Sequence, residues 1–405
     1  MSTVFPSVTR VVSGMRPTGR LHLGHYHGVL KNWVRLQSEY DCFFFVADWH
    51  ALTTHYADPS VIARSVRDMV VDWLAAGINP QTATLFVQSD VPQHAELHLL
   101  LSMITPLGWL ERVPTFKDQQ EQLRERDLAT YGFLGYPLLQ SADILSYRAA
   151  YVPVGEDQVS HIELAREVAR RFNHLYGQEP AFLEKAEEAV RAMGRKAAKA
   201  YKELRDAYVE RGDKEALETA RVLVERQTNM TMGDKERLLG YLEGHGRLVL
   251  TEPQALLTPH ARMPGLNGQK MSKSYGNTIT LREAPDSVVN KIKTMPTDPA
   301  RKRRTDPGNP DLCPVWPFHE LYSTDDVRAW VREGCTTAGI GCLQCKQPVI
   351  DAMNAELAPI RERAREWEQD EGHVRIIMAE GARRAREIAD ETLTDVRRAM
   401  GLAWE

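Results

Sequence analysis

The sequence lacks the features that mark membrane and secreted proteins. No stretch approaches about 18 consecutive apolar residues, the length that a membrane-spanning helix requires. The opening residues, MSTVFPSVTRVVSG, contain no long apolar core of the kind found in a signal peptide. A strong excess of one charge sign is also absent, because 51 Lys and Arg residues stand against 55 Asp and Glu residues. We therefore predict a cytoplasmic protein without a membrane segment, in which any contact with RNA comes from local patches.

Cysteine is scarce, and its spacing does not resemble a secreted disulfide framework. Of five cysteines, four fall close together at Cys313, Cys335, Cys342 and Cys345, whereas Cys42 is distant in the sequence. Cys342 and Cys345 can hold one metal centre, and two more distant thiolates would complete four ligands. This count fits zinc or an iron–sulfur cluster, and unligated thiols remain the alternative.

The chain has the composition of an ordinary globular protein and is long enough for two domains. Its 405 residues are 43% hydrophobic and 26% charged. Apolar runs of strand length occur at Val8–Val12, Asp41–Asp48 and Thr84–Gln88. Helical patterns separate these runs, the clearest at Pro59–Ala76. The alternation predicts an α/β fold with a doubly wound parallel sheet, which binds ligands at the carboxyl ends of its strands.

The segments after Gln88 contain further helical and strand patterns. Tyr136–Tyr147 has helical spacing, and Tyr151–Val154 has the pattern of a short strand. Residues 180–250 are rich in Ala, Glu, Lys and Arg, which predicts an inserted helical hairpin followed by a short strand at Leu248–Leu250. Glu356–Met400 is an arginine- and glutamate-rich helical segment that we expect to close a C-terminal bundle.

One stretch, Pro17–His25 (PTGRLHLGH), follows the first predicted strand and opens a helical pattern. Its glycines allow the backbone to approach a bulky ligand, and the free N–H groups at the start of a helix bind anions. His22 and His25 could donate hydrogen bonds to phosphate oxygens. On this spacing alone, two histidines that cap a surface helix are the simpler interpretation.

A second stretch, Gln269–Thr278 (QKMSKSYGNT), carries Lys270 and Lys273 in a glycine-bounded loop. Compact cationic groups on a mobile backbone can neutralise a triphosphate and then release pyrophosphate. A solvated basic loop is the alternative. A match of both stretches to one known pattern, in the right order, favours a nucleotide site over these simpler interpretations.

The motifs HLGH and KMSKS resemble the two signature motifs of class I aminoacyl-tRNA synthetases. Further stretches resemble the bacterial tryptophanyl-tRNA synthetases within that class: SGMRPTG, YDCFFFVADWHALT, ATLFVQSDVPQHAEL, YPLLQSADIL and VPVGEDQVSHIELAREVARRFN. The resemblance implies a Rossmann-type catalytic domain and a helical C-terminal domain. It also implies ATP-dependent activation of L-tryptophan, transfer to tRNA(Trp), and a homodimer.

We expect four segments on this basis. The catalytic domain comprises residues 1–178 and, with the KMSKS loop, residues 251–285. The helical insertion occupies residues 179–250, and the helical domain that binds the tRNA anticodon and carries the cysteines occupies residues 286–405.

The resemblance also implies roles for individual residues. His22, His25, Lys270 and Lys273 would stabilise the phosphates, and Lys117 matches a lysine near pyrophosphate. Mg²⁺ would accompany ATP, held mainly by phosphates and water. The implied ATP site is formed by Arg16, Pro17, Thr18, Gly24, His25, Gly155, Glu156, Asp157, Met263, Lys270, Met271, Ser272, Lys273 and Ser274.

Asp143 lies in the apolar helical stretch YPLLQSADIL, where a carboxylate must reach solvent or a partner. The indole of tryptophan offers only an N–H donor, so a buried carboxylate acceptor suits it. Asp143 matches the family's indole-binding aspartate, with Gln140 one turn before it. Gln140 departs from the methionine common in relatives, and the pattern Gln-x-x-Asp also occurs in tyrosyl enzymes. An aspartate on the helix surface is the alternative.

The cysteine spacing resembles the set that binds a [4Fe–4S] cluster in a subset of tryptophanyl enzymes, with zinc as the alternative. Lys291, Lys293 and residues 301–304 form a basic stretch suited to tRNA phosphates. Three other functions remain open: a tyrosyl-tRNA synthetase, a small-molecule nucleotidyltransferase outside the synthetases, and an RNA-binding paralogue without catalysis.

Overall fold

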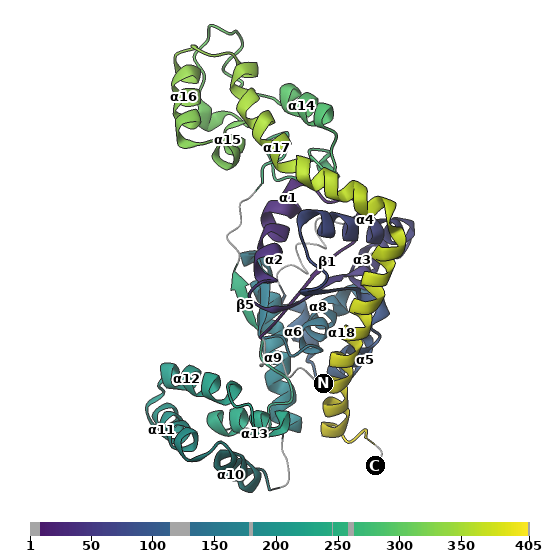
Figure 1. The fold of residues 1–405 in the computed structure, drawn as a ribbon, viewed down its shortest axis with the longest axis vertical. Helices are drawn as coiled ribbons and strands as arrows, with labels where there is room; N and C mark the ends of the chain where they lie inside the picture. Colours follow the sequence, from purple (N-terminus) through teal and green to yellow (C-terminus); the bar gives the residue numbers. More distant parts are fainter. Residues whose placement is uncertain (1–8, 114–129, 178–180, 245, 258–262, 404–405) are drawn as a thin grey trace.

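The computed structural model describes residues 9–113, 130–177, 181–244, 246–257 and 263–403. At its centre is a parallel sheet of five strands in the order β3-β2-β1-β4-β5 (Figure 1). The strands are β1 (Arg10–Met15), β2 (Asp41–Val46), β3 (Ala83–Val87), β4 (Tyr151–Val154) and β5 (Gln254–Leu257). The predicted doubly wound α/β sheet is confirmed.

Strand β2 shows why the apolar runs form inner strands. Phe43 and Phe44 are both fully buried, although adjacent side chains on a strand point to opposite faces. Phe44 stacks on Trp33 with ring centroids 4.2 Å apart, and Phe43 stacks on Tyr147 at 4.9 Å. Both faces of the sheet are therefore covered, as expected for a parallel sheet.

Helices surround this sheet. The catalytic part of the chain contains α1 (Leu23–His25), a π-helical turn η1 (Tyr26–Leu30), α2 (Lys31–Leu36), α3 (Asp48–His55), α4 (Ser60–Ala76), α5 (Gln93–Ser102), α6 (Leu107–Glu111), α8 (Tyr131–Leu145) and α9 (Val159–Tyr176). The C-terminal part contains α14 (Pro285–Thr294), α15 (Trp316–Tyr322), α16 (Asp325–Thr336), α17 (Cys342–Gln369) and α18 (Glu371–Ala399). Short 3₁₀ turns lie at Gln88–Asp90, Glu156–Gln158, Lys273–Tyr275 and Pro310–Leu312.

The segment expected to be a helical hairpin contains four helices instead. These are α10 (Phe182–Ala192), α11 (Arg195–Arg211), α12 (Lys214–Glu225) and α13 (Met232–Glu243). They share a hydrophobic core that includes Tyr201, Val224 and Leu238. Two helices alone would leave these side chains exposed, which is why the segment needs four. The strand expected at Leu248–Leu250 is also wrong, because the last strand, β5, begins later.

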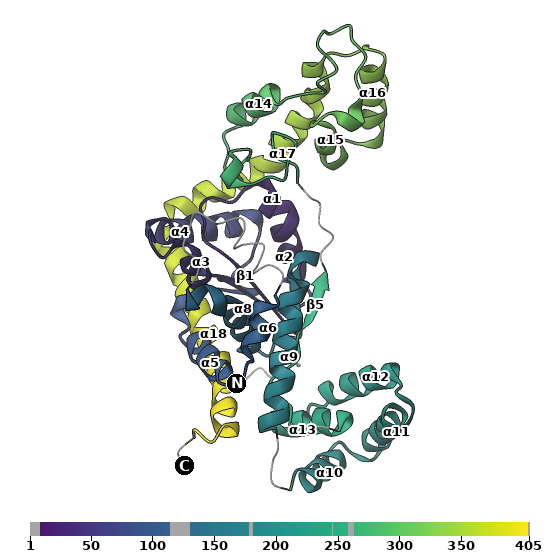
Figure 2. The same ribbon diagram turned by 180° about the vertical axis from the view of Figure 1, so that it is seen from behind.

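The C-terminal helix α18 does not close a separate bundle, so that expectation is wrong. It packs on β3 and α5, while α17 packs along α4. Gly381 allows this close approach, since a Cβ atom there would lie 1.8 Å from the backbone oxygen of Leu85 in β3. Figures 1 and 2 both show α17 leaving the α14–α16 group and α18 running along the sheet.

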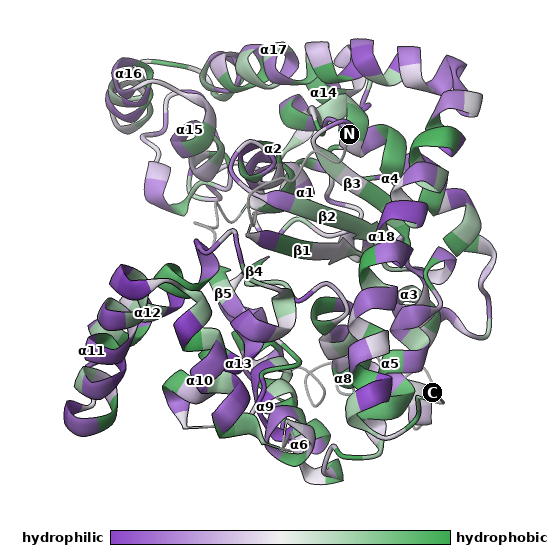
Figure 3. Ribbon diagram, turned by 60° about the horizontal axis from the view of Figure 1, so that its bottom comes forward, coloured by the Kyte–Doolittle hydropathy of each residue, from purple (hydrophilic) through white to green (hydrophobic). Residues whose placement is uncertain are grey.

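The molecule is elongated, with α10–α13 at one end and α14–α16 at the other (Figure 2). Hydrophobic residues are concentrated in the central strands, whereas α11 consists mainly of hydrophilic residues (Figure 3). Among the described helices, none combines the length and apolar character needed to cross a membrane.

Candidate active site

The strand order places a topological switch point between β1 and β4, the position at which α/β folds bind ligands in a crevice outside the strand ends. Chain connections leave these neighbouring strands in opposite directions across the sheet. The segment that follows β1 is Arg16–His25, and the segment that follows β4 is Gly155–Asp157. Both stretches of the predicted ATP site therefore start at the carboxyl ends of the two strands that flank the switch point.

The two signature histidines begin the helix after β1, and each uses its Nδ1 atom locally. The Nδ1 of His22 accepts the N–H of Gly24 at 3.1 Å, and the Nδ1 of His25 accepts the N–H of His22 at 3.2 Å. The two rings lie 3.8 Å apart between centroids. Because both Nδ1 atoms accept, the neutral rings carry their protons on Nε2 and can donate from there to a phosphate.

Burial and the nearby Lys273 ammonium lower the pKa of His22 to about 4. Burial also holds the pKa of His25 well below its ordinary value, assisted by His22 and Lys273. Both rings are therefore neutral hydrogen-bond donors near pH 7.

The second signature lies directly against the first. The N–H of Leu23 donates to the carbonyl of Ile279 and the N–H of Leu281 to that of Leu21, each at 3.0 Å. The Nζ of Lys273 donates to the carbonyls of Thr18 at 3.1 Å and Gly19 at 2.8 Å. The structure thus brings His22, His25 and Lys273 together, although about 250 residues separate the two motifs.

Asn277 braces the lysine loop, and sequence reasoning did not single it out. It is 3% exposed, and its Oδ1 accepts the N–H of Ser272 at 2.8 Å. Its Nδ2 donates to the carbonyl of Lys270 at 3.1 Å. A buried amide that satisfies two backbone groups fixes the loop while the Lys270 side chain remains exposed.

The other predicted ATP residues surround this junction. Met271 and Met263 are buried and joined by a backbone hydrogen bond of 3.2 Å. Gly155 is buried, whereas Glu156 and Asp157 are exposed at the start of the helical segment after β4. In the turn after β1, Arg16 is exposed, Pro17 is buried, and Thr18 and Gly24 are half-buried. Ser274 belongs to the 3₁₀ turn of the lysine loop. Lys117 lies outside the described residues.

Asp143 lies in the interior, on α8, and is 1% exposed. Its Oδ2 accepts from the Nε2 of His50, and its Oδ1 accepts from the Nε2 of Gln88 and the Nδ1 of His94, each at 2.7 Å. The Nε2 of His94 in turn contacts the hydroxyl of Tyr147 at 2.5 Å. His50 and Gln88 follow the carboxyl ends of β2 and β3, so this site lies at the same edge of the sheet as the signature motifs.

These partners keep Asp143 ionised. Burial opposes ionisation, but the hydrogen bonds and charge interactions of His50 and His94 hold the pKa of the carboxyl well below its usual range. A carboxylate offers about four acceptor sites. Among the contacts of the described residues, Oδ2 accepts one hydrogen bond and Oδ1 accepts two. Gln140, one turn earlier, is half-buried.

Four cysteines line one cavity in the C-terminal part. Cys313 precedes α15, Cys335 ends α16, and Cys342 and Cys345 lie in the first turn of α17. All four thiols face the same cavity, together with Arg301 and Lys346. Within the described ranges, no group of three or more His, Cys, Asp or Glu side chains is arranged to hold a single metal ion.

Burial, reinforced by the three neighbouring thiols, raises the pKa of Cys345 to about 12. The Cys345 thiol is therefore protonated, and binding of a metal group would release its proton. Arg301 approaches the Sγ of Cys335 at 3.9 Å and supplies a positive charge at the cavity wall.

The parallel sheet, its topological switch point and the two joined signature motifs define a class I aminoacyl-tRNA synthetase. The family model described as tRNA synthetases class I (W and Y) matches residues 7–209 and 213–358. The chain belongs to this family.

Individual relatives give a narrower comparison than the family model. A tryptophan–tRNA ligase of Ralstonia nicotianae is 64% identical over 401 residues, which cover 99% of this chain and all of the relative. A tryptophan–tRNA ligase of Thermotoga maritima is 44% identical and covers 98% of this chain and all of its own length. Among solved structures, the tryptophanyl-tRNA synthetase of Campylobacter jejuni complexed with ADP and tryptophan is similar, with a TM-score of 0.71 and 26% identity over 97% of this chain and 100% of that one.

Proposed function

We infer that this chain is a tryptophan–tRNA ligase, which activates L-tryptophan with ATP and transfers it to tRNA(Trp). Full-length relatives with that name carry the assignment. The observation in the structure that supports it best is Asp143, a buried and ionised carboxylate whose Oδ2 accepts one hydrogen bond from the described residues and can also accept an indole N–H.

In the first step, the carboxylate of tryptophan attacks the α-phosphorus of ATP, which forms tryptophanyl-adenylate and releases pyrophosphate. In the second, a hydroxyl of the terminal ribose of the tRNA attacks the aminoacyl carbonyl and displaces AMP. No protein nucleophile is required, so catalysis depends on alignment and on stabilisation of charge. ATP enters with Mg²⁺, whose ligands are mainly phosphate and water oxygens.

We assign roles to the residues at the crevice. His22 and His25 donate from Nε2 to phosphate oxygens, and Lys273 and Lys270 neutralise the charge that develops on pyrophosphate. Arg16, Pro17 and Thr18 line the turn beside them, and Gly155–Asp157 faces the ribose. Lys117 is assigned to pyrophosphate from its motif alone.

The test is tryptophan-dependent exchange of labelled pyrophosphate into ATP. Exchange with tryptophan and not with tyrosine supports the proposal, whereas the reverse result identifies a tyrosyl enzyme. Lys273→Ala should lose more than about 100-fold in exchange, because it removes a cation at the developing charge, while tryptophan still binds in calorimetry. Exchange equal to that of the unmodified protein would contradict the role of Lys273.

We propose that the four cysteines hold a [4Fe–4S] cluster rather than zinc. All four thiols line one cavity, together with Arg301 and Lys346. Four thiolates are the ligand set of a [4Fe–4S] cluster, and the cysteine spacing resembles that of the cluster-binding subset of tryptophanyl enzymes. Such a cluster would tie together the segments before α15, at the end of α16 and at the start of α17.

An absorbance spectrum of protein purified without oxygen tests this proposal. Iron and sulfide content near four per chain, with a broad absorption near 400 nm, is about what a [4Fe–4S] cluster gives. Cys342→Ser should lose the absorption, while Cys42→Ala, which changes a cysteine buried in β2, should keep it. Stoichiometric zinc, or no metal in the unmodified protein, would contradict the cluster.

We further propose a homodimer and a tRNA-binding C-terminal part. Large exposed apolar side chains occur on α5, between α5 and α6, on α6 and on α8, namely Leu99, Met103, Leu107 and Tyr131. Helix α8 packs against both α5 and α6, so these side chains come from one group of helices, as a dimer interface requires. The basic residues Lys291, Lys293 and 301–304 are assigned to tRNA phosphates. A cytoplasmic location agrees with this function.

The predicted boundaries at residues 178, 250 and 285 remain our proposal for the segments, with one qualification. Because α18 and part of α17 pack on the catalytic sheet and α4, the anticodon-binding part is assigned to α14–α16 and the start of α17.

A further inference from the structure

Helix α4 contains an ionisable side chain, Asp72, that the mechanism above does not use. Asp72 is 1% exposed and lies among apolar neighbours such as Met69 and Trp73. A buried carboxylate is costly unless it is paired, so its partners indicate what it does.

Its two carboxylate oxygens contact two different segments of the active site. The Oδ2 atom accepts the backbone N–H of Leu21 at 3.0 Å. The Oδ1 atom pairs with the Nε of Arg282 at 2.8 Å. Leu21 immediately precedes the signature histidine His22, and Arg282 follows the lysine loop by a few residues.

These two segments are already paired with each other at this point. The carbonyl of Leu21 accepts the N–H of Leu281 at 3.0 Å, and His22 forms an antiparallel bridge with Thr280. Asp72 therefore satisfies the remaining polar group of Leu21 from the side of α4. Through Arg282 it also holds the strand-like segment that pairs with Leu21.

Arg282 extends the contact to other helices. The Arg282 side chain is 8% exposed. Its Nη2 contacts the Oδ1 of Asp68 at 3.0 Å, and its Nη1 contacts Glu368 of α17. Asp68 also faces Arg20 at 3.7 Å. The guanidinium thus joins α4, α17 and the segment after the lysine loop.

We propose that Asp72 is a positioning residue for ATP activation, which holds the histidine segment and the lysine segment in register and supplies a negative charge near Lys273. This inference rests on the proposed function, since it requires that His22, His25 and Lys273 act on the phosphates of ATP.

The charge has a specific consequence for Lys273. Burial lowers the pKa of Lys273 to about 8, and the negative charge of Asp72 acts against this lowering. The other groups that face Lys273 are the Thr18 and Gly19 carbonyls and the neutral rings of His22 and His25. Asp72 in turn faces Arg282 and Asp68, and burial raises the pKa of Asp72 to about 6. Asp72 therefore favours the protonated form of Lys273.

Asp72→Asn separates positioning from packing, because asparagine has the same shape and keeps an acceptor for the N–H of Leu21 but removes the charge. We expect kcat/KM for ATP in pyrophosphate exchange to fall about tenfold, the size of a weakened charge-assisted hydrogen bond. The alkaline limb of the pH profile, which reports the free enzyme, should move down by about half a pH unit or more. KM for tryptophan should stay within about twofold, since the Asp143 site is built from other residues.

Two further variants complete the test. Glu387→Gln removes the same charge from the exposed face of α18 and should leave the profile unchanged. Arg282→Lys keeps the positive charge near Asp72 but loses the branched contacts to Asp68 and Glu368. For Arg282→Lys we expect kcat/KM for ATP to fall several-fold while the alkaline limb of its pH profile stays in place. This variant provides the test if Asp72→Asn does not fold.

The outcomes distinguish failure of the positioning role from failure of the proposed function. If the unmodified protein lacks tryptophan-dependent exchange, or if Lys273→Ala retains it, the proposed function fails. If both behave as expected but the Asp72→Asn profile coincides with that of the unmodified protein, the positioning role of Asp72 is overturned. Loss of thermal stability in Asp72→Asn without a shift of the alkaline limb would likewise assign Asp72 to packing alone.

Discussion

The two histidines after β1 act as neutral donors because their other ring nitrogens already accept backbone N–H groups. Charged imidazoles beside Lys273 would repel it, and the low pKa of His22 avoids this conflict. In the proposed function, the two rings therefore provide directional hydrogen bonds and the two lysines provide positive charge.

At the residue scale, the proposed function assigns the choice of amino acid to Asp143. Asp143→Asn places an amide where two histidine donors and one glutamine donor converge, so one N–H must face another donor. We expect kcat/KM for tryptophan to fall about 100-fold, the range for an unsatisfied charged hydrogen-bond site, with KM for ATP nearly unchanged. Steady-state pyrophosphate exchange measures both constants.

The opposite pattern is expected for Asp157→Asn at the start of the helical segment after β4. This variant should raise KM for ATP and leave the constants for tryptophan near those of the unmodified protein. A normal tryptophan constant in folded Asp143→Asn would refute the assignment of the indole site.

At the element scale, the π-helical turn after the signature histidines joins the C-terminal helices. The Nε2 of His27 lies 3.0 Å from both the hydroxyl of Tyr322 and the Oε2 of Glu356, and Lys31 donates to the Oε1 of Glu356 at 2.6 Å. Helix α17, which carries Glu356, thereby connects the histidine segment with the part of the chain that holds the cysteines.

Glu356→Gln should destabilise the protein in a pH-dependent way. Burial opposes ionisation, but the His27 and Lys31 partners lower the pKa of Glu356 from 4.5 to about 2. A depressed carboxyl pKa stabilises the folded state above pH 4.5 and loses that effect as the pH falls through about 2. We expect a loss on the order of 2 kcal/mol at pH 7.

Urea unfolding at pH 7 and pH 3 measures this difference, which should shrink at the lower pH. Glu320→Gln, an exposed glutamate on α15, is the matched control and should change little. An equal loss for Glu356→Gln at both pH values would contradict the assignment.

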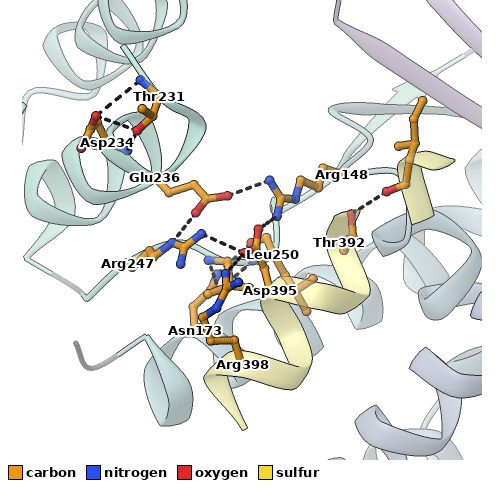
Figure 4. A network of polar contacts seen from close by, with 12 residues as sticks. Arg148, Asn173, Thr231, Asp234, Glu236, Arg247, Leu250, Thr392, Asp395 and Arg398 are labelled. Atoms are coloured by element: carbon orange, nitrogen blue, oxygen red, sulfur yellow. Dashed lines mark hydrogen bonds and ion pairs between the residues drawn. The ribbon is translucent and has the colours of Figure 1, made fainter. Parts of the chain in front are cut away.

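The inserted helices dock on the catalytic part through a network of ion pairs (Figure 4). Glu236 of α13 is 6% exposed at its side chain, lies 2.7 Å from the Nη1 of Arg148 and also contacts Arg247. Arg148 and Arg247 both reach Asp395 of α18, at 2.5 and 3.3 Å. Three segments of the chain that are distant in sequence, around Arg148, residues 236–247 and Asp395, therefore meet at one largely buried charge cluster.

Glu236→Ala should loosen this docking, because it leaves two guanidinium groups close together with one carboxylate fewer. Removal of one partner from a buried pair costs about 3 kcal/mol. We expect faster amide hydrogen exchange in α10–α13 and little change in the central strands. Glu218→Ala, which removes an exposed glutamate paired with Arg221, is the control. Unchanged exchange in Glu236→Ala would show that apolar contacts alone hold the insertion.

At the scale of the whole molecule, the proposed dimer provides the clearest test. Met103 is 67% exposed, and other large apolar side chains of the α5, α6 and α8 group are exposed as well. Met103→Glu should weaken the dimer by on the order of 2 kcal/mol, since it places a charge in an apolar contact. Light scattering coupled to size-exclusion chromatography measures the mass as a function of concentration.

Leu183→Glu changes an equally exposed apolar residue, 63% exposed, on α10 of the insertion. We expect this variant to keep the mass of the unmodified protein. Dissociation by Leu183→Glu and not by Met103→Glu would move the interface to the insertion.

Much of the secondary structure was predictable from the sequence because it depends on residues that are close together in the chain. The apolar runs Asp41–Asp48 and Thr84–Gln88 contain β2 and most of β3, and Tyr151–Val154 coincides with β4. The glycines of the HLGH and KMSKS stretches likewise predicted the turns in which these motifs lie. The hairpin expected in the insertion was too small, since periodicity shows that a helix has an apolar face but not how many helices are needed to cover it.

The amino-acid sequence by itself determined which chemical groups are available, namely the two imidazoles, the two lysines, the lone acid in an apolar helix and the clustered thiols. Only the tertiary structure decided which groups meet. His50, Gln88 and His94 surround Asp143 from positions 93, 55 and 49 residues away, and α18 lies on β3 rather than in a separate bundle. The physical reason is that local conformation depends on neighbours in the chain, whereas these contacts depend on how all elements pack together to bury apolar surface and pair buried charges.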